Sequence, residues 1–207
     1  MILMKPDEIR QDPILIASPT RCGTTMLAWL LHLHGVWIGK SGVTKAPETN
    51  PQVGTENTEL KNYLKHGVAG DIPLDFRKQI ARRVETTGPW LLKTAGNLLQ
   101  QDAWLQHFPD ARWVLPFRDF DDIIESAMRH PGFAKAGRAR RRQIAAQHIE
   151  LQYRVAERAK HVIWVDVDKI GRGNISEAQK LFDFCEIPLD AGVFISWIDP
   201  GRWHGGA

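Results

Sequence analysis

The chain has 207 residues, 43% of them hydrophobic, which is enough for one domain with a sizeable core. Its formal net charge of +3 is modest for a nucleic-acid-binding protein, so we expect no nucleic-acid partner. The two cysteines give neither a disulfide framework nor the spacing of a metal site, and no apolar run is long enough for a signal peptide or a membrane span, so we expect a cytoplasmic protein.

The first predicted elements are an apolar strand over 13–17 and an apolar helix over 22–34, joined by a tight loop. Backbone N–H groups at a helix start have no intrahelical acceptor and lie at the positive end of the helix dipole. Arg21 adds a cation to this junction, and Thr24 and Thr25 add hydroxyl donors. The pattern therefore predicts a phosphate-binding loop.

The loop differs from the nucleotide-binding pattern G-x-x-x-x-G-K-[ST] in two places. Counting back from Gly23, Ser18 takes the place of the first glycine, and Thr24 takes the place of the lysine. A kinase or nucleotide hydrolase of the Walker type needs that lysine on the transferred phosphate. The loop shape is thus predicted without the residue that phosphoryl transfer requires.

The next part of the chain, 39–75, is rich in glycine and proline and predicts an irregular segment. Long segments of this kind carry binding function or lid motion, and we expect one of these roles here. A helix over about 74–86 follows, then a strand over 90–93 and a helix over about 98–107. Lys93 would lie at the carboxyl end of its strand.

A second candidate binding position follows the apolar strand predicted over 112–117. Apolar residues recur with helical spacing over 119–130, which places Arg118 at the strand end and Ser126 about two turns into the next helix. A guanidinium and a hydroxyl suit a phosphate dianion, and ligands of doubly wound sheets lie outside these strand ends. The alternative is a surface ion pair between Arg118 and one of the acids Asp119, Asp121 and Asp122.

The last predicted elements are a helix around 141–159, a strand over 161–165 and a helix that ends near Cys185, with Ser176 and Gln179 as its capping box. A basic cluster over 138–142 precedes them. Such a cluster is more often a solvated face than a site, and the functional alternative is a segment that returns onto bound phosphates.

Strands that alternate with helices predict a single-domain α/β protein over 1–207, a P-loop-like three-layer fold with a central parallel sheet flanked by helices. Nothing in the sequence indicates an oligomeric state.

Two motifs in this order resemble those of the sulfotransferase superfamily. The run Arg21-Cys22-Gly23-Thr24-Thr25 resembles the family's 5′-phosphosulfate loop, and Arg118 with Ser126 resembles its 3′-phosphate site. The strand containing Leu92-Lys93-Thr94 and the stretch Asn50–Asn57 are similar to bacterial members. The resemblance covers about residues 12–187.

The resemblance implies a sulfonate transfer from 3′-phosphoadenosine 5′-phosphosulfate (PAPS), without a metal, to a hydroxyl or amine of a small-molecule or glycan acceptor. The residues it assigns to PAPS binding are Arg21, Cys22, Gly23, Thr24, Thr25, Arg118 and Ser126. It assigns catalysis to Arg21, Lys93 and Glu56, with Glu48 as a rival base.

One departure from the family pattern bears on activity. Bacterial members commonly continue the Leu-Lys-Thr strand with Pro-Arg-His, whereas this chain has Ala95-Gly96-Asn97. Gly201–His204 is similar to the element that closes over the nucleotide, although it is short. Two other functions therefore stay open: a P-loop kinase or nucleotide hydrolase, with Asp166 as its magnesium-binding acid, and an inactive nucleotide-binding module.

Overall fold

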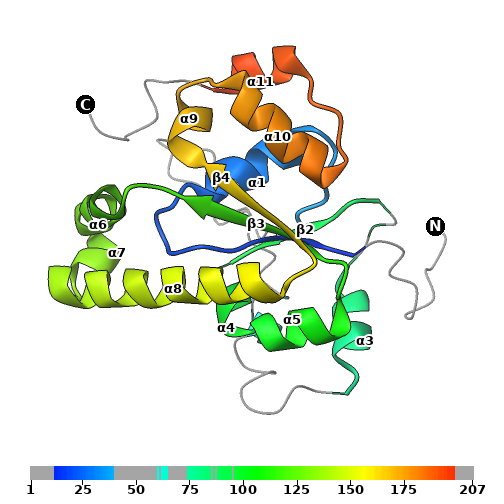
Figure 1. Ribbon diagram of the computed structural model, residues 1–207, viewed down its shortest axis with the longest axis horizontal. Helices are drawn as coiled ribbons and strands as arrows, with labels where there is room; N and C mark the ends of the chain where they lie inside the picture. Colours follow the sequence, from blue (N-terminus) through cyan, green and yellow to red (C-terminus); the bar gives the residue numbers. More distant parts are fainter. Residues whose placement is uncertain are drawn as a thin grey trace.

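The computed structural model describes residues 12–39, 60, 62–64, 74–84, 86, 88–94 and 96–198. Four parallel strands form its sheet in the order β2-β1-β3-β4 (Figure 1). Their bounds are β1 (Ile14–Ile16), β2 (Leu91–Lys93), β3 (Arg112–Phe117) and β4 (His161–Asp166). The predicted α/β class and parallel sheet are confirmed.

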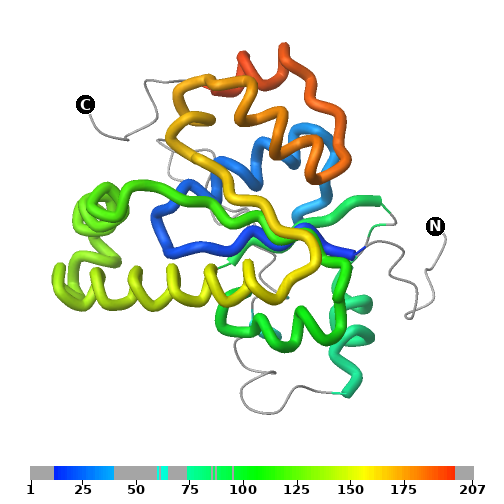
Figure 2. Tube along the Cα trace, viewed as in Figure 1, coloured from blue at the N-terminus to red at the C-terminus, as the bar shows by residue number. Residues whose placement is uncertain are grey.

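The chain order of the strands places a topological switch point at β1. From β1 the chain crosses to β2 on one side, and it later returns to pair β3 with the other side of β1 (Figure 2). Ile16 lies opposite Lys93 of β2 and Val114 of β3. Ligands of such sheets bind outside the carboxyl ends of the strands at the switch point, so the loop after β1 has the expected location.

Helices cover both faces of the sheet. Their bounds are α1 (Thr24–Leu33), α3 (Phe76–Ala81), α4 (Gly96–Leu99), α5 (Gln101–His107), α6 (Phe120–Arg129), α7 (Pro131–Ala134), α8 (Arg138–Arg158), α9 (Val167–Gly171), α10 (Ile175–Cys185) and α11 (Ala191–Trp197). Helices α1, α9, α10 and α11 lie on one face, and α3, α4, α5 and α8 lie on the other (Figure 1).

Alternate residues of the strands build two separate cores. Ile14, Ile16 and Val114 pack with α1 and α10 on one face. Leu15 and Trp113 pack on the other face with the aromatic side chains of α3 and α5. Both faces of each central strand are therefore buried, which explains why these strands read as continuous apolar runs.

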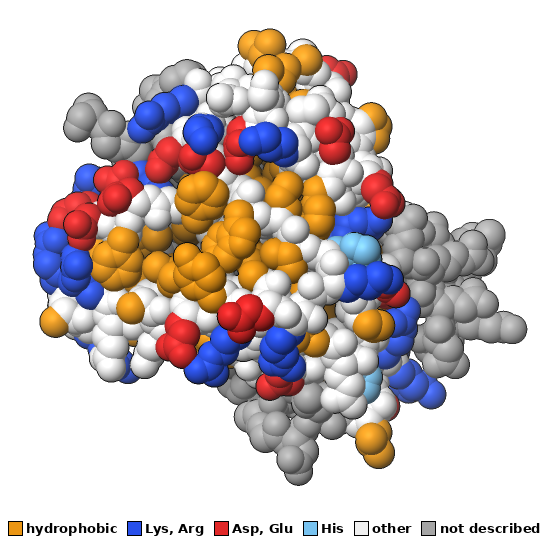
Figure 3. Space-filling view, viewed as in Figure 1, with side chains coloured by type: hydrophobic (Ala, Val, Ile, Leu, Met, Phe, Trp, Pro, Cys, Tyr) orange, Lys and Arg blue, Asp and Glu red, His pale blue; other side chains and the backbone are white. Residues whose placement is uncertain are grey.

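Strand β4 forms one edge of the sheet. Hydrophobic side chains gather on the surface between α8 and α9 (Figure 3). Phe117 at the end of β3 is 42% exposed and Tyr153 of α8 is 60% exposed, and the Tyr153 ring lies 5.2 Å from the ring of Trp164 on β4. Strand β4 thus adjoins an apolar surface.

Several predicted boundaries were wrong. The helix expected over 98–107 is two helices, α4 and α5, and Gln100 between them is in a turn. The cap of α10 is Asn174, whose side chain accepts a hydrogen bond from the Glu177 N–H, so the capping box at Ser176 is not used. An asparagine at the N-cap satisfies the same orphan donor as a serine.

The segment 39–75 is not irregular throughout. Leu60 and residues 62–64 are helical, and Leu60 and Leu64 are buried in the core that contains Phe76. Leucines four residues apart lie on one helical face, which outweighs the nearby chain breakers. Most of the segment lies outside the described residues.

Candidate active site

The loop between β1 and α1 has a backbone suited to anions. Arg21 and Gly23 have φ values of 71° and 67°, both left-handed, and Gly23 is the N-cap of α1. Left-handed residues in a turn direct successive N–H groups into one concavity, where they bind negatively charged groups. The Gly23 carbonyl accepts the N–H of Leu27 at 3.3 Å, so the helix begins directly at the loop.

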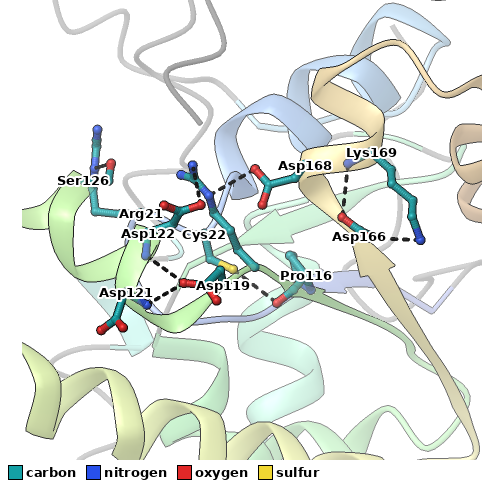
Figure 4. Close-up of polar contacts among 11 residues, drawn as sticks. Arg21, Cys22, Pro116, Asp119, Asp121, Asp122, Ser126, Asp166, Asp168 and Lys169 are labelled. Atoms are coloured by element: carbon teal, nitrogen blue, oxygen red, sulfur yellow. Dashed lines mark hydrogen bonds and ion pairs between the residues drawn. The ribbon is translucent and has the colours of Figure 1, made fainter. Parts of the chain in front are cut away.

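Arg21 connects this loop to α6. Its Nε donates a hydrogen bond to Ser126 Oγ at 3.2 Å, and the two side chains lie beside each other (Figure 4). Partial desolvation, together with the positive charges of Arg118 and Arg129, lowers the pKa of the Arg21 guanidinium. Three cations and a hydroxyl therefore converge where the loop after β1 meets the helix after β3.

Arg118 is held between two carboxylates. Its side chain is only 5% exposed, with Nε 3.1 Å from Asp168 Oδ1 and Nη2 3.7 Å from Asp122 Oδ2. The alternative expectation of an ion pair with a neighbouring acid is thus realised at Asp122, but the shorter contact is to Asp168 on α9. Ser126, by contrast, contacts Arg21. A phosphate site shared by Arg118 and Ser126 stays a prediction.

Lys93 reaches the same region from β2. The residue is 8% exposed, and its Nζ donates to Thr25 Oγ1 at 3.2 Å in the first turn of α1. Lys93 is the last residue of β2, as predicted, and this hydrogen bond holds it beside the start of α1.

Cys22 has a packing role in the loop. It is 1% exposed, and its thiol donates to the Pro116 carbonyl at 3.4 Å (Figure 4). Burial raises its pKa to about 12, despite the opposing effects of a hydrogen bond from Ser18 and the charge of Arg118. The thiol is therefore protonated and attaches the loop to β3.

Comparison with known proteins decides the family. Residues 13–191 match the sulfotransferase family. The chain belongs to this family. A crystal structure of a sulfotransferase from Mycobacterium avium superimposes with a TM-score of 0.61 at 14% identity, over 92% of this chain and 68% of that one, which shows a shared fold. None of the curated proteins matches the sequence.

Asp166, the acid that favoured a kinase, has a local role in this sulfotransferase fold. Its side chain caps α9 by accepting the Lys169 N–H at 3.1 Å, and it pairs with Lys169 Nζ at 3.2 Å (Figure 4). Among the described residues, no group of three or more His, Cys, Asp or Glu side chains is placed to hold a metal ion.

The basic cluster of this sulfotransferase is largely engaged with its own helices. Arg138 pairs with Glu125, Arg142 pairs with Asp121, and Arg141 donates to the Phe133 carbonyl. The cluster thus attaches the start of α8 to α6 and α7, in agreement with a structural role.

Sequence reasoning missed two charged residues near the site. Arg129 lies three residues after Ser126, on the same face of α6, which is a signal that helical periodicity could have provided. Asp168 follows β4, and only the pairing of β4 with β3 brings it to Arg118.

The candidate bases Glu48 and Glu56 and the stretch Gly201–His204 lie outside the described residues. Asn97, at the position of the family's usual histidine, is fully buried and donates to two strand carbonyls. Within the described part of the chain, no helix is long and apolar enough to cross a membrane.

Proposed function

We propose that this chain transfers the sulfonate group of PAPS to a hydroxyl or amine of a small-molecule or glycan acceptor. The observation that carries the proposal is the contact between Arg21 and Ser126. It joins the two sequence motifs, which are far apart in the chain, at the carboxyl edge of the sheet, and this supports a single site that would bind both charged ends of PAPS.

The chemistry of the side chains fits such a donor. The left-handed loop offers N–H groups to the 5′-phosphosulfate, with Arg21, Thr24 and Thr25 as further donors and Cys22 and Gly23 shaping the turn. Arg118 and Ser126 would bind the 3′-phosphate. A guanidinium already buried and oriented by carboxylates loses little further side-chain freedom when an anion binds.

The reaction is an in-line displacement at sulfur. The acceptor oxygen or nitrogen forms a bond to sulfur while the bond from sulfur to the bridging phosphate oxygen breaks, and the acceptor's proton passes to a base, for which Glu56 is our candidate. Negative charge grows on the bridging oxygen. Arg21 and Lys93 would stabilise this charge, and each oriented donor contributes about 3 kcal/mol in comparable sites.

The test is calorimetric titration with 3′-phosphoadenosine 5′-phosphate (PAP), the product. We expect binding that is independent of magnesium and much tighter than that of ATP. Arg118→Ala should weaken this binding. Arg154→Ala, which removes an exposed arginine paired with Glu150 on α8, is the matched control and should leave it unchanged. Magnesium-dependent ATP binding without PAP binding would instead support a kinase or hydrolase.

Transfer of labelled sulfonate from PAPS then separates an enzyme from an inactive module. Because Arg21 is expected to act mainly in the transition state, Arg21→Ala should reduce turnover far more than it weakens PAP binding. Near-normal turnover of Arg21→Ala would refute this role. We further propose that residues 1–207 form one domain acting in the cytoplasm, with 39–75 contacting the acceptor.

A further inference from the structure

Gln152 is a buried polar residue whose side chain contacts the ends of two strands. It lies on α8, is 2% exposed, and its Nε2 donates at 3.0 Å both to the Ala17 carbonyl and to the Pro116 carbonyl. Ala17 comes directly before residues 18–23, which form the loop that leads into α1 and which we call the anion-binding loop. Pro116 lies two residues before Arg118. One side-chain amide therefore joins the carboxyl ends of β1 and β3 directly beneath the candidate site.

The Gln152 amide replaces a backbone hydrogen bond that the proline in β3 cannot make. In a parallel pair, each residue bonds to two residues of the neighbouring strand that lie two positions apart. Ala17 donates its N–H to the Val114 carbonyl at 3.1 Å, so its own carbonyl faces position 116. Proline has no N–H to donate, and in a central strand it leaves a gap in the ladder. Gln152 supplies the missing donor.

The same amide supports the loop itself. The Pro116 carbonyl accepts both the Gln152 amide and the Cys22 thiol, which belongs to the loop. Helix α8, strand β3 and the loop thus meet at one carbonyl oxygen. On the other side of β1, Asn97 of α4 is 0% exposed and donates to the carbonyls of Ile16 and Leu92. Buried amides therefore connect β1 to both of its neighbours.

We propose that Gln152 is a positioning residue for the anion-binding loop. Its amide replaces the hydrogen bond that Pro116 cannot make, and it thereby sets the distance between the loop and the end of β3. The loop contains Arg21, and Arg118 and Ser126 follow β3. This inference rests on the proposed function for its binding readout. The order of the loop in the free protein does not depend on that function.

The test compares Gln152→Met with Gln101→Met, a matched change at a second buried glutamine, which lies on α5. Methionine keeps the length and burial of the side chain but removes the donor to the Ala17 carbonyl and leaves the Pro116 carbonyl with the Cys22 thiol as its side-chain donor. Because an unsatisfied buried acceptor costs more than the bond was worth, we expect PAP binding about tenfold weaker in Gln152→Met. Hydrogen exchange of the loop amides in the free protein should be about tenfold faster. Gln101→Met should change neither.

Rescue distinguishes positioning from a general loss of stability. Pro116→Ala introduces an N–H at the position that faces the Ala17 carbonyl, so the double variant with Gln152→Met should recover most of the loop protection and PAP affinity. Unchanged loop exchange in Gln152→Met, equal effects of Gln101→Met, or failure of the rescue would each overturn the proposal. If the native protein binds no PAP, the proposed function fails, and loop exchange still decides the role of Gln152.

Discussion

The ion pair between Arg118 and Asp168 allows a quantitative test of how the site is held together. We consider Arg118→Ala, Asp168→Ala and the double variant as one thermodynamic cycle. Each single change removes one charge of this pair, whereas the double variant removes both. The coupling free energy obtained from the cycle isolates the pair from the other contacts of either residue.

The expected magnitude follows from distance and burial. At 3.1 Å between Nε and Oδ1, the attraction is roughly 5 kcal/mol at an effective dielectric constant of about 20. The side chains are 5% and 18% exposed, so desolvation of both charges offsets a large part of this attraction. We expect a coupling free energy of about 2 kcal/mol.

Arg154 and Glu150 on α8 provide the comparison within the same chain. Their atoms approach to 2.6 Å, closer than those of the buried pair, but the side chains are 58% and 62% exposed. Exposed pairs of this spacing on a helix couple by about 0.4 kcal/mol. If distance decided the strength, this pair would be the stronger one; we expect it to be several times weaker because water screens it.

Urea unfolding of the native protein and the three variants of each cycle, followed by tryptophan fluorescence, gives the coupling free energies. A coupling at Arg118 and Asp168 that is no larger than that at Arg154 and Glu150 would refute the reasoning. It would mean that Arg118 is not held in place before an anion binds.

Three further predictions concern the rest of the chain. Burial lowers the pKa of His148, so this side chain stays neutral to lower pH in the folded protein than in the unfolded chain, where it protonates near pH 6.5. The free energy of unfolding should therefore fall as pH decreases below about 6.5, and His148→Gln should reduce this dependence in urea titrations. Burial raises the pKa of Cys22 and of Cys185 to about 12, so iodoacetamide should label them slowly in the folded protein and rapidly in urea. Trp104 is fully buried, with its ring 5.2 Å from that of Phe76, and Trp104→Ala should lower the free energy of unfolding by about 3–5 kcal/mol.

Each of these three predictions has a specific result that would contradict it. An unchanged pH dependence in His148→Gln would show that this imidazole does not contribute to acid sensitivity. Rapid labelling of Cys22 in the folded protein would mean that its loop opens frequently. A loss below about 1 kcal/mol for Trp104→Ala would mean that the surrounding aromatic side chains collapse into the space.

The strands were predictable because buried parallel strands have continuous apolar runs, and the predicted bounds of β3 agree with the structure. The short helices α7, α9 and α11 were not predicted. They have four to seven residues, too few for a periodic apolar pattern, and tertiary packing determines where they form.

Some residues of the candidate site could likewise be predicted from the sequence, and others could not. Arg21, Lys93 and Arg118 follow or end strands, so their placement at one edge of the sheet could be inferred from the chain order. Asp168 and Gln152 could not be assigned, because each acts on a strand end that only the sheet order and the position of α8 bring near.

The left-handed conformation of Arg21 has an evolutionary consequence. At a φ of 71°, a side chain costs roughly 1–2 kcal/mol more than glycine would. A chain under selection for folding alone would gain stability by losing this arginine, and mutation would supply glycine readily. A guanidinium at this unfavourable backbone position would be kept only by selection for the anion that Arg21 is proposed to bind, and a lineage that lost the activity should lose this residue early.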